Sequence, residues 1–263
     1  MSDRPPPGSP TAVTNRLRAA GCVFAEDEAD LLIAAARTPT ELDEMVERRV
    51  TGLPLEQVLG WAEFCGIRVA VDPGVFVPRQ RTEFLLRQAA SFALSGAVVV
   101  DMCCGSGALG VALAASVDGT ELHASDIDPA AVRCARRNVG PIGGDVYEGN
   151  LFDALPASLR GRVDILMANT PYVPTEEIEM LPREARLHEP RMALDGGPDG
   201  LDVVRRVASA APDWLAPGGH LLIETSRHQA QLAAAVFEAG GLVPRVNTSE
   251  ELDATVVIGA RHE

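Results

Sequence analysis

From residue 97 onward the sequence alternates between short apolar runs and amphipathic stretches, and this alternation constrains the fold more than any other feature. The apolar runs that predict strands fall at residues 97–101, 120–125, 144–148, 163–168, 219–224, 242–246 and 254–260. Stretches with helical spacing lie at residues 107–116, 128–138, 200–215 and 228–239. Alternation of this kind predicts an α/β fold with a mostly parallel, doubly wound sheet of these strands.

Polar side chains stand at or just beyond the ends of four of these predicted strands. They are Asp101, Asp126, Asn150 and Asn169. Ligands of doubly wound sheets bind at the carboxyl ends of the strands. The four positions together therefore indicate one ligand site, more strongly than any single motif does.

A glycine turn follows the first of these strands. Asp101 leads into Met102-Cys103-Cys104-Gly105-Ser106-Gly107, and a helix start rich in small residues comes next. Glycine has no Cβ, so Gly105 and Gly107 let a ligand approach the backbone closely. Asp126 lies about twenty residues further on, the spacing at which a carboxylate binds ribose hydroxyls. The turn therefore predicts a cofactor that contains a ribose.

Two cofactors compete for this turn. Gly105-x-Gly107-x-x-Gly110 matches the dinucleotide pattern, which alone is a weak signal. Asp101 at the end of the first strand would repel a pyrophosphate and attract a cationic amino-acid group. S-adenosylmethionine carries a sulfonium, an ammonium group and a ribose, so it fits these residues better than NAD does.

The apolar run at residues 163–168 ends in Asn169-Thr170-Pro171-Tyr172. Pro171 has a fixed φ and biases Thr170 toward an extended backbone. A side-chain amide, a free backbone carbonyl and an aromatic ring are thus held in one short turn, which suits a planar group carrying an NH2. The alternative interpretation is an ordinary exit from a strand into a loop.

Composition excludes several classes of protein. All 23 basic residues are arginines, which excludes a Walker-type phosphate loop and a lysine Schiff base. The five cysteines are odd in number and include no Cys-x-x-Cys, so neither a disulfide scaffold nor a metal site is expected. A net charge of −14 argues against an extended nucleic-acid surface, and the apolar runs are too short for a membrane span.

The first 95 residues predict a different organisation. Residues 1–10 are rich in proline and are expected to be a disordered lead-in without a signal core, which places the protein in the cytoplasm. Residues 11–66 predict short helices, with the clearest spacing at 27–36 and 40–50. Residues 67–95 are expected to link this region to a domain at 96–263, through a hairpin of 67–71 with 75–77 and a helix at 82–94.

Several blocks in one order resemble the protein-(glutamine-N5) methyltransferases of the HemK type, which methylate the Gly-Gly-Gln glutamine of class I peptide chain release factors. The blocks are residues 52–60 and 63–66, Val77-Pro78-Arg79-Gln80-Arg81-Thr82-Glu83, the turn from Asp101 to Gly107, Glu189-Pro190, Gly196-Gly197 and Pro217-Gly218-Gly219 with Glu224. The resemblance implies a seven-stranded Rossmann-like methyltransferase sheet, a small N-terminal helical domain that docks the release factor, and a monomer.

The resemblance also implies roles for individual residues. Asn169, Thr170, Pro171 and Tyr172 would be catalytic: the Asn169 Oδ1 and the Thr170 carbonyl each accept an amide N–H of the target glutamine, and Tyr172 stacks on its plane. The cofactor S-adenosylmethionine would be bound by Asp101, Cys103, Cys104, Gly105, Ser106, Gly107, Asp126, Asn150, Leu151 and Asn169. Arg79 is expected either to meet the methionine carboxylate or to form an ion pair between domains.

Three positions depart from the family pattern. Thr170 replaces the first proline of Asn-Pro-Pro-Tyr, Cys103 stands where a glycine is usual, and Asn150 stands where an aspartate is usual. Because the family uses the main-chain carbonyl at the position of Thr170, the chemistry is expected to persist. A glutamine in another protein, an exocyclic amine of DNA or RNA, and a cofactor-binding module without catalysis remain alternatives.

Overall fold

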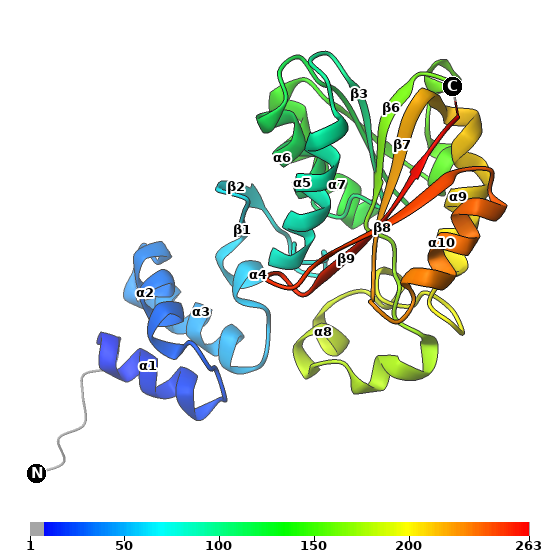
Figure 1. Cartoon of the computed structure of the whole chain (residues 1–263). Helices are drawn as coiled ribbons and strands as arrows, with labels where there is room; N and C mark the ends of the chain where they lie inside the picture. Colours follow the sequence, from blue (N-terminus) through cyan, green and yellow to red (C-terminus); the bar gives the residue numbers. More distant parts are fainter. Residues whose placement is uncertain (1–7, 263) are drawn as a thin grey trace, which may run out of the picture.

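A seven-stranded, mostly parallel sheet forms the larger part of the molecule, as the sequence predicts (Figure 1). The computed structural model describes residues 8–262, so most of the predicted lead-in, residues 1–7, lies outside them. The strands are β3 (Val98–Met102), β4 (Glu121–Asp126), β5 (Asp145–Glu148), β6 (Val163–Ala168), β7 (Leu215–Thr225), β8 (Val243–Ser249) and β9 (Ala254–Ala260). Their order is β5-β4-β3-β6-β7-β9-β8; only β9 runs antiparallel to its neighbours.

Helices cover both faces of this sheet, which is why its central strands are apolar throughout. All five residues of β3 are buried, as in a strand covered on both sides. One face carries α5 (Glu83–Phe92), α6 (Ala108–Ser116) and α7 (Pro129–Val139). The other face carries α9 (Asp202–Trp214) and α10 (Ala230–Ala239).

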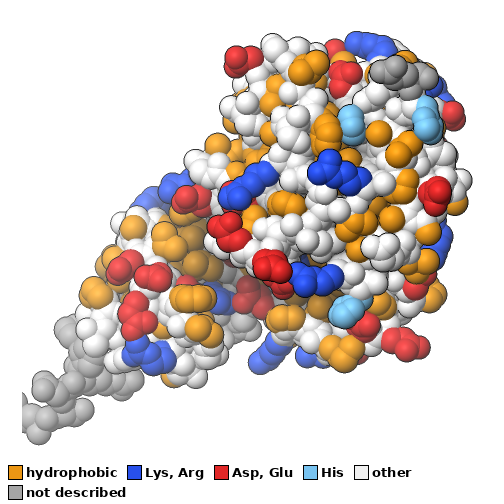
Figure 2. Space-filling model, in the orientation of Figure 1, with side chains coloured by type: hydrophobic (Ala, Val, Ile, Leu, Met, Phe, Trp, Pro, Cys, Tyr) orange, Lys and Arg blue, Asp and Glu red, His pale blue; other side chains and the backbone are white. Residues whose placement is uncertain are grey.

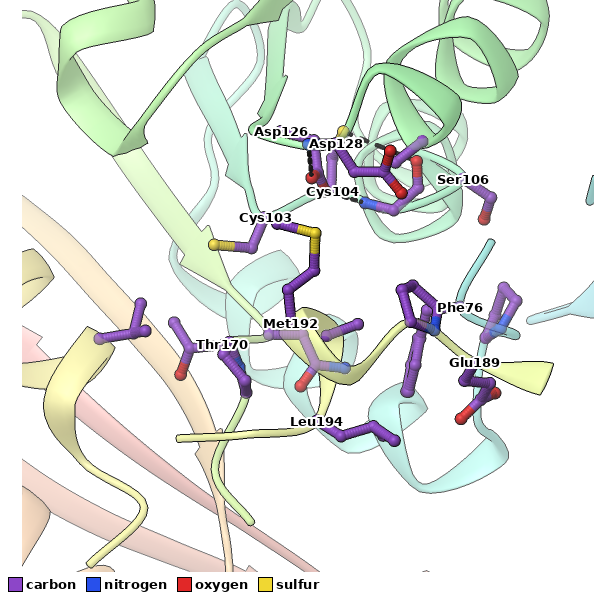
Figure 3. A pocket seen from close by; sticks show the side chains of 18 of the residues that line it. Phe76, Cys103, Cys104, Ser106, Asp126, Asp128, Thr170, Glu189, Met192 and Leu194 are labelled. Carbon is purple, nitrogen blue, oxygen red and sulfur yellow. Dashed lines mark hydrogen bonds between the residues drawn. The ribbon is translucent and has the colours of Figure 1, made fainter. Parts of the chain in front are cut away.

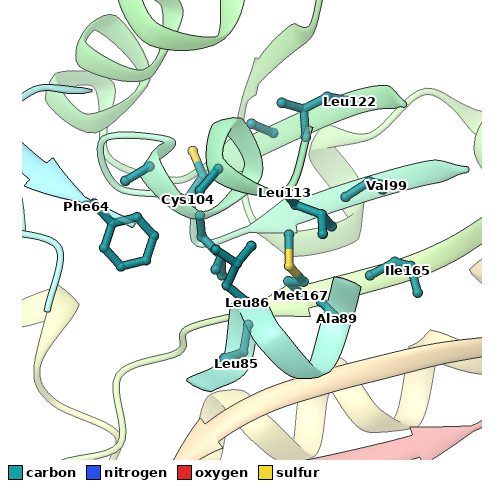
Figure 4. Packing of buried hydrophobic residues seen from close by; sticks show 14 of the residues in the cluster. Phe64, Leu85, Leu86, Ala89, Val99, Cys104, Leu113, Leu122, Ile165 and Met167 are labelled. Atoms are coloured by element: carbon teal, nitrogen blue, oxygen red, sulfur yellow. The ribbon is translucent and has the colours of Figure 1, made fainter. Parts of the chain in front are cut away.

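Successive residues of β3 pack into opposite cores. Val99 of β3 packs with Leu113 of α6 and Met167 of β6 in the first core (Figure 4), whereas Val98 and Val100 belong to the second core. This alternation follows from the period of two along a β-strand.

The N-terminal part forms a helical unit with its own core. Its helices are α1 (Pro10–Ala19), α2 (Ala25–Ala35), α3 (Pro39–Val50) and α4 (Leu55–Leu59). Leu17, Leu32 and Val46 pack together there and are fully buried. The predicted lead-in is wrong at its end: α1 begins at Pro10, where proline at the first turn is favoured, and the Ser9 Oγ accepts from the Ala12 N–H. The predicted domain boundaries at residues 66 and 95 stay predictions.

The hairpin of residues 67–71 with 75–77 is a wrong prediction. β2 (Ile67–Ala70) pairs antiparallel with β1 (Trp61–Phe64) instead. The two-residue loop between them is Cys65-Gly66, and both residues have positive φ, 50° and 76°, as a tight hairpin turn requires. Val75 is bound differently: its carbonyl accepts from the Gln57 Nε2 at 2.9 Å.

The connection between β6 and β7 contains elements that the sequence did not predict. They are the 3-10 helices η5 (Thr175–Met180) and η6 (Arg191–Ala193) and the short helix α8 (Arg183–His188). Shorter 3-10 turns elsewhere are η1 (Gln80–Thr82), η2 (Gly140–Ile142), η3 (Leu151–Ala154) and η4 (Ala157–Leu159). None of the helices within residues 8–262 combines the length and apolarity that crossing a membrane requires.

The buried position of Leu113 gives a test of this packing. Replacing Leu113 by Ala should lower the free energy of unfolding by about 2–5 kcal/mol, because the side chain is fully buried between α6 and the sheet. Urea denaturation measures the change. Leu232→Ala on α10, where the leucine is half exposed, is the matched control and should change the stability by about 0.5 kcal/mol or less. Equal losses in the two variants would contradict this account of the core.

Candidate functional site

A cavity of about 790 Å³ lies at the carboxyl ends of β3, β4 and β6. The predicted site residues that line it are Asp101, Cys103, Cys104, Gly105, Ser106, Asp126, Asn150, Leu151, Asn169, Thr170, Pro171 and Tyr172. The sheet register explains the convergence, since Met102 of β3 lies between Ser125 of β4 and Ala168 of β6. Figure 3 shows the cysteines, Asp126, Thr170 and Glu189 around this space.

Gly107 is the one predicted site residue that does not line the cavity. It precedes α6 with a φ of 77°, and a Cβ there would come within 2.9 Å of the Val139 Cγ2. Close packing of the turn against α7 therefore requires this glycine, whatever ligand is bound.

Asp101 is a carboxylate held almost entirely out of water. Its side chain is 1% exposed, and its Oδ2 accepts from the Gly110 N–H at 2.9 Å. A Cβ at Gly110 would come within 3.0 Å of that oxygen, so this glycine serves the contact with Asp101. Desolvation raises the pKa of Asp101 to about 7, and the negative charge of Asp126 adds to the effect.

Asp126 ties the glycine turn to β4. Its Oδ2 accepts from the Gly105 N–H at 2.8 Å and its Oδ1 from the Asp128 N–H at 2.9 Å. Burial raises the pKa of Asp126 although these N–H groups oppose the rise. Asp101 and Asp126 together make this end of the cavity negative, which suits a cation and ribose hydroxyls.

The two adjacent cysteines of the turn are protonated thiols at its surface toward the cavity. Cys103 has a φ of 56°, the left-handed region that favours glycine. Burial raises the pKa of both thiols far above the ordinary value, so they stay protonated at neutral pH and are poor nucleophiles. All five cysteines of the chain are free.

Asn150 and Leu151 form the opposite rim. The Asn150 Oδ1 accepts from the Arg206 Nη2 at 2.8 Å, and Leu151 has a φ of 53°. Arg206 belongs to α9 and also lines the cavity. The sequence does not predict this contact, because the two residues are far apart in the chain and Arg206 has the pattern of any polar residue of an amphipathic helix.

The turn after β6 holds its amide in one orientation. The Asn169 Nδ2 donates to the Thr82 Oγ1 at 3.4 Å, which leaves the Asn169 Oδ1 to accept from a ligand. Thr82 is buried, and it comes from the linker block that the sequence singled out. Thr170 is 1% exposed, and its hydroxyl has no hydrogen-bond partner.

Tyr172 is clamped from two sides. Its hydroxyl donates to the Glu224 Oε1 at 3.2 Å, and its carbonyl accepts from the Gln229 Nε2 at 2.8 Å. The Arg81 Nε donates to the same Glu224 oxygen at 3.1 Å, with the guanidinium 5.6 Å from the centre of the tyrosine ring. Burial raises the pKa of Tyr172 well above its ordinary value. The hydroxyl therefore stays protonated and keeps donating.

Gly196 and Gly200 are required because the backbone of the turn at residues 171–172 lies directly against them. A Cβ at Gly200 would lie 2.2 Å from the Tyr172 carbonyl oxygen, and one at Gly196 would lie 2.7 Å from the Pro171 carbonyl oxygen. The glycine-containing loop thus packs directly against the backbone of the turn.

Arg79 forms an ion pair within the protein. Its Nη2 lies 2.5 Å from the Glu189 Oε1, which also accepts from the Val77 N–H at 3.3 Å. Glu189 has no exposed side-chain surface, and burial raises its pKa. Of the two roles expected for Arg79, the structure shows the ion pair.

Some lining residues had no signal in the sequence. Phe76 and Met192 both line the cavity, and Figure 3 shows Met192 between Cys103 and Leu194. Isolated apolar residues in loops cannot be told from core residues by pattern alone, since no periodicity surrounds them.

The residues present fit S-adenosylmethionine. The negative end at Asp101 and Asp126 suits its cations and ribose, and the apolar walls around Leu151 and Met192 suit its adenine and thioether carbons. Within residues 8–262 no three His, Cys, Asp or Glu side chains are grouped to hold a metal ion. On the face drawn in Figure 2, acidic and basic side chains are interspersed.

Comparison with known proteins finds methyltransferases similar in sequence and in fold. A family model described as "Methyltransferase small domain" matches residues 66–198. A release factor glutamine methyltransferase of Geobacter sulfurreducens is 37% identical over 82% of this chain and 76% of its own. A 4-amino-L-phenylalanine/4-methylamino-L-phenylalanine methyltransferase of Streptomyces pristinaespiralis is 35% identical over 88% of this chain and 80% of its own. The solved structure of a methyltransferase from Pyrococcus furiosus shares the fold, with a TM-score of 0.58. It is 15% identical in sequence, and the match covers 75% of this chain and 90% of that one.

The raised pKa of Asp101 predicts how stability depends on pH. The unfolded carboxyl titrates near 3.8 and the folded one near 7. Between these values the folded protein binds more protons, so its stability falls as the pH rises. Asp101→Asn removes this titration and keeps the size of the side chain. The ligand-free Asn variant should therefore gain stability relative to the wild type as the pH rises from about 4 to about 7.

Urea unfolding at several pH values measures this difference. Asp153→Asn, at an exposed carboxyl of η3, is the control for the loss of one charge. If the free energies of unfolding of Asp101→Asn and the wild type differ by the same amount at every pH, Asp101 does not titrate in this range.

Proposed function

The chain belongs to the release factor glutamine methyltransferase family, and we propose that it transfers a methyl group from S-adenosylmethionine to the side-chain amide nitrogen of a protein glutamine. The Asn169 amide carries the proposal. Thr82 occupies its Nδ2, so its Oδ1 is the free acceptor at the end of β6, beside the negative end of the cavity. An amide NH2 has two hydrogens, and the Thr170 carbonyl is the second acceptor of the turn.

When bound, S-adenosylmethionine supplies an electrophilic methyl group. Asp101 and Asp126 would bind the cationic part of the cofactor and its ribose. Asn150 and Leu151, at the rim of the cavity, would contact its adenine. The glycine turn brings backbone close to the cofactor because Gly105 has no side chain, and its N–H is already bound by Asp126.

The difficulty of the reaction is that an amide nitrogen is a poor nucleophile, since its lone pair is delocalised into the carbonyl. Two carbonyl oxygens that accept its hydrogens fix the direction of the nitrogen. They also stabilise the positive charge that develops on nitrogen during methyl transfer, because their dipoles point at its hydrogens. The methylated nitrogen then releases one proton readily, so no strong base is needed. Consistent with this, no histidine is among the cavity-lining residues of the described chain.

We propose the glutamine of the Gly-Gly-Gln motif of class I release factors as the target. The support is the named Geobacter sulfurreducens relative together with the clamped turn of Asn169 and Tyr172. The test is to incubate the protein with labelled S-adenosylmethionine and unmethylated class I release factor, and to locate the methyl group by mass spectrometry.

Asn169→Ala should lower kcat by about 100-fold or more, because one of the two acceptors for the reacting amide is lost. Circular dichroism and thermal unfolding should match the wild type, since Asn169 is only partly buried. Arg245→Ala, on the exposed edge strand β8, is a control and should keep full activity. Methylation at the wild-type rate by Asn169→Ala would refute the role of this amide.

Thr170→Val should leave kcat within about threefold of the wild type, because the proposed acceptor is the main-chain carbonyl and not the side chain. The same change should raise the free energy of unfolding by about 1 kcal/mol, because it removes a buried hydroxyl without a partner. A loss of methylation larger than tenfold would instead assign the hydroxyl to the substrate.

A second candidate is methylation of an aromatic amine on a small molecule. The Streptomyces pristinaespiralis relative covers 88% of this chain, and Phe64, Phe76 and Tyr172 place aromatic rings around the cavity. 4-Amino-L-phenylalanine offered in the same assay decides between the two. A higher kcat/KM for this amine than for the release factor would favour the second candidate.

A further inference from the structure

A second cavity, of about 420 Å³, lies next to the proposed catalytic turn, residues 169–172, and Tyr172 forms part of its wall. Arg81 and Tyr172 line both cavities, so they form the wall between them. Its other lining residues come from the end of β7 and the loop after it, including Glu224, Arg227 and His228, and from the start of β9, including Thr255. These two segments meet because β9 runs antiparallel to β7, with Thr255 opposite Thr225.

The informative residue of this cavity is Glu224. Its Oε1 accepts from the Tyr172 hydroxyl and from the Arg81 Nε, but its Oε2 is buried and has no hydrogen-bond partner. The residue is 2% exposed, so water satisfies this oxygen poorly. A buried carboxylate oxygen without a donor is unfavourable, and such groups in native proteins normally have a partner.

The geometry points to a substrate subsite: we propose that the second cavity receives the backbone next to the methylated residue, and that the Glu224 Oε2 accepts one of its N–H groups. This inference rests on the proposed function. Because Tyr172 and Arg81 line both cavities, the second cavity adjoins the first, and the backbone beside a side chain that reaches Asn169 can extend into it.

The chemistry of the cavity suits a backbone segment. The residues before the proposed target are glycines, which offer only N–H and C=O groups for recognition. Glu224 supplies an acceptor for an N–H. The Thr255 hydroxyl and the exposed Arg227 at the rim can donate to a C=O.

The two oxygens of Glu224 give it two separable roles. Through Oε1 it positions Tyr172, and this role is lost in Tyr172→Phe, which lacks the hydroxyl. Through Oε2 it would bind the substrate, and this role persists in Tyr172→Phe. Glu224→Gln keeps the size of the side chain but replaces one oxygen by an NH2 and removes the charge that both roles use.

The experiment measures kcat and KM of full-length protein for unmethylated class I release factor in five forms: wild type, Glu224→Gln, Tyr172→Phe, His228→Trp and His262→Trp. His228 is exposed at the rim of the second cavity, so a tryptophan there narrows the entrance. His262 is exposed beyond the far end of β9 and provides the same substitution away from both cavities. Binding of S-adenosylmethionine by calorimetry and thermal unfolding report on the first cavity and on folding.

We expect His228→Trp to raise KM about tenfold with kcat within about twofold, and His262→Trp to match the wild type. Glu224→Gln should raise KM at least about fivefold more than Tyr172→Phe does, because only Glu224→Gln alters the Oε2 contact. Cofactor affinity should be the same in all five forms.

Two results would overturn the subsite while leaving the proposed function intact. One is a wild-type KM in His228→Trp, and the other is the same KM in Glu224→Gln and Tyr172→Phe, which would reduce Glu224 to a positioning residue. Failure of the wild type to methylate any release factor while it still binds the cofactor would instead refute the proposed function, and the subsite with it.

Discussion

A carboxylate kept out of water at the end of the central strand is the constraint around which the site is organised. Asp101 is the last residue but one of β3, the strand whose residues contribute to both cores, and it accepts from the Gly110 N–H near the start of α6. Because an unpaired buried charge is unfavourable, the ligand-free site favours a cation in the adjoining cavity. Gly110 follows from this arrangement, since a Cβ there would come within 3.0 Å of the Asp101 Oδ2. Gly105, whose N–H binds Asp126, has a φ of 55°, in the left-handed region that favours glycine.

The turn of residues 169–172, which we propose as catalytic, depends on partners from distant parts of the chain. Asn169 is oriented by Thr82 of the linker, and Tyr172 is held by Glu224 at the end of β7 and by Gln229 just before α10. The Thr82 contact orients the amide that the proposed reaction uses, and the contacts of Glu224 and Gln229 hold the ring and the backbone of Tyr172 beside it. Preorganisation of this kind means that little reordering remains when a substrate arrives.

The sequence predicts the parts of this site that are local. The strand ends at Asp101, Asp126 and Asn169 follow from apolar runs, and a parallel sheet then brings them together without further information. The contacts of Arg206 and Gln229 are not predictable in this way, because each joins residues more than 50 positions apart and no pattern links them. The helix α8 was missed because its segment has too few buried positions to show a period.

Cys103 affects both the strain and the conformational entropy of the glycine turn. An L-residue in the left-handed region is strained by roughly 1–2 kcal/mol, which glycine avoids. The same side chain restricts the unfolded chain, so less conformational freedom is lost on folding than with glycine. It also narrows the set of shapes that the turn can sample once folded. A cysteine at this position therefore lowers the stability somewhat and makes the loop stiffer than a glycine would.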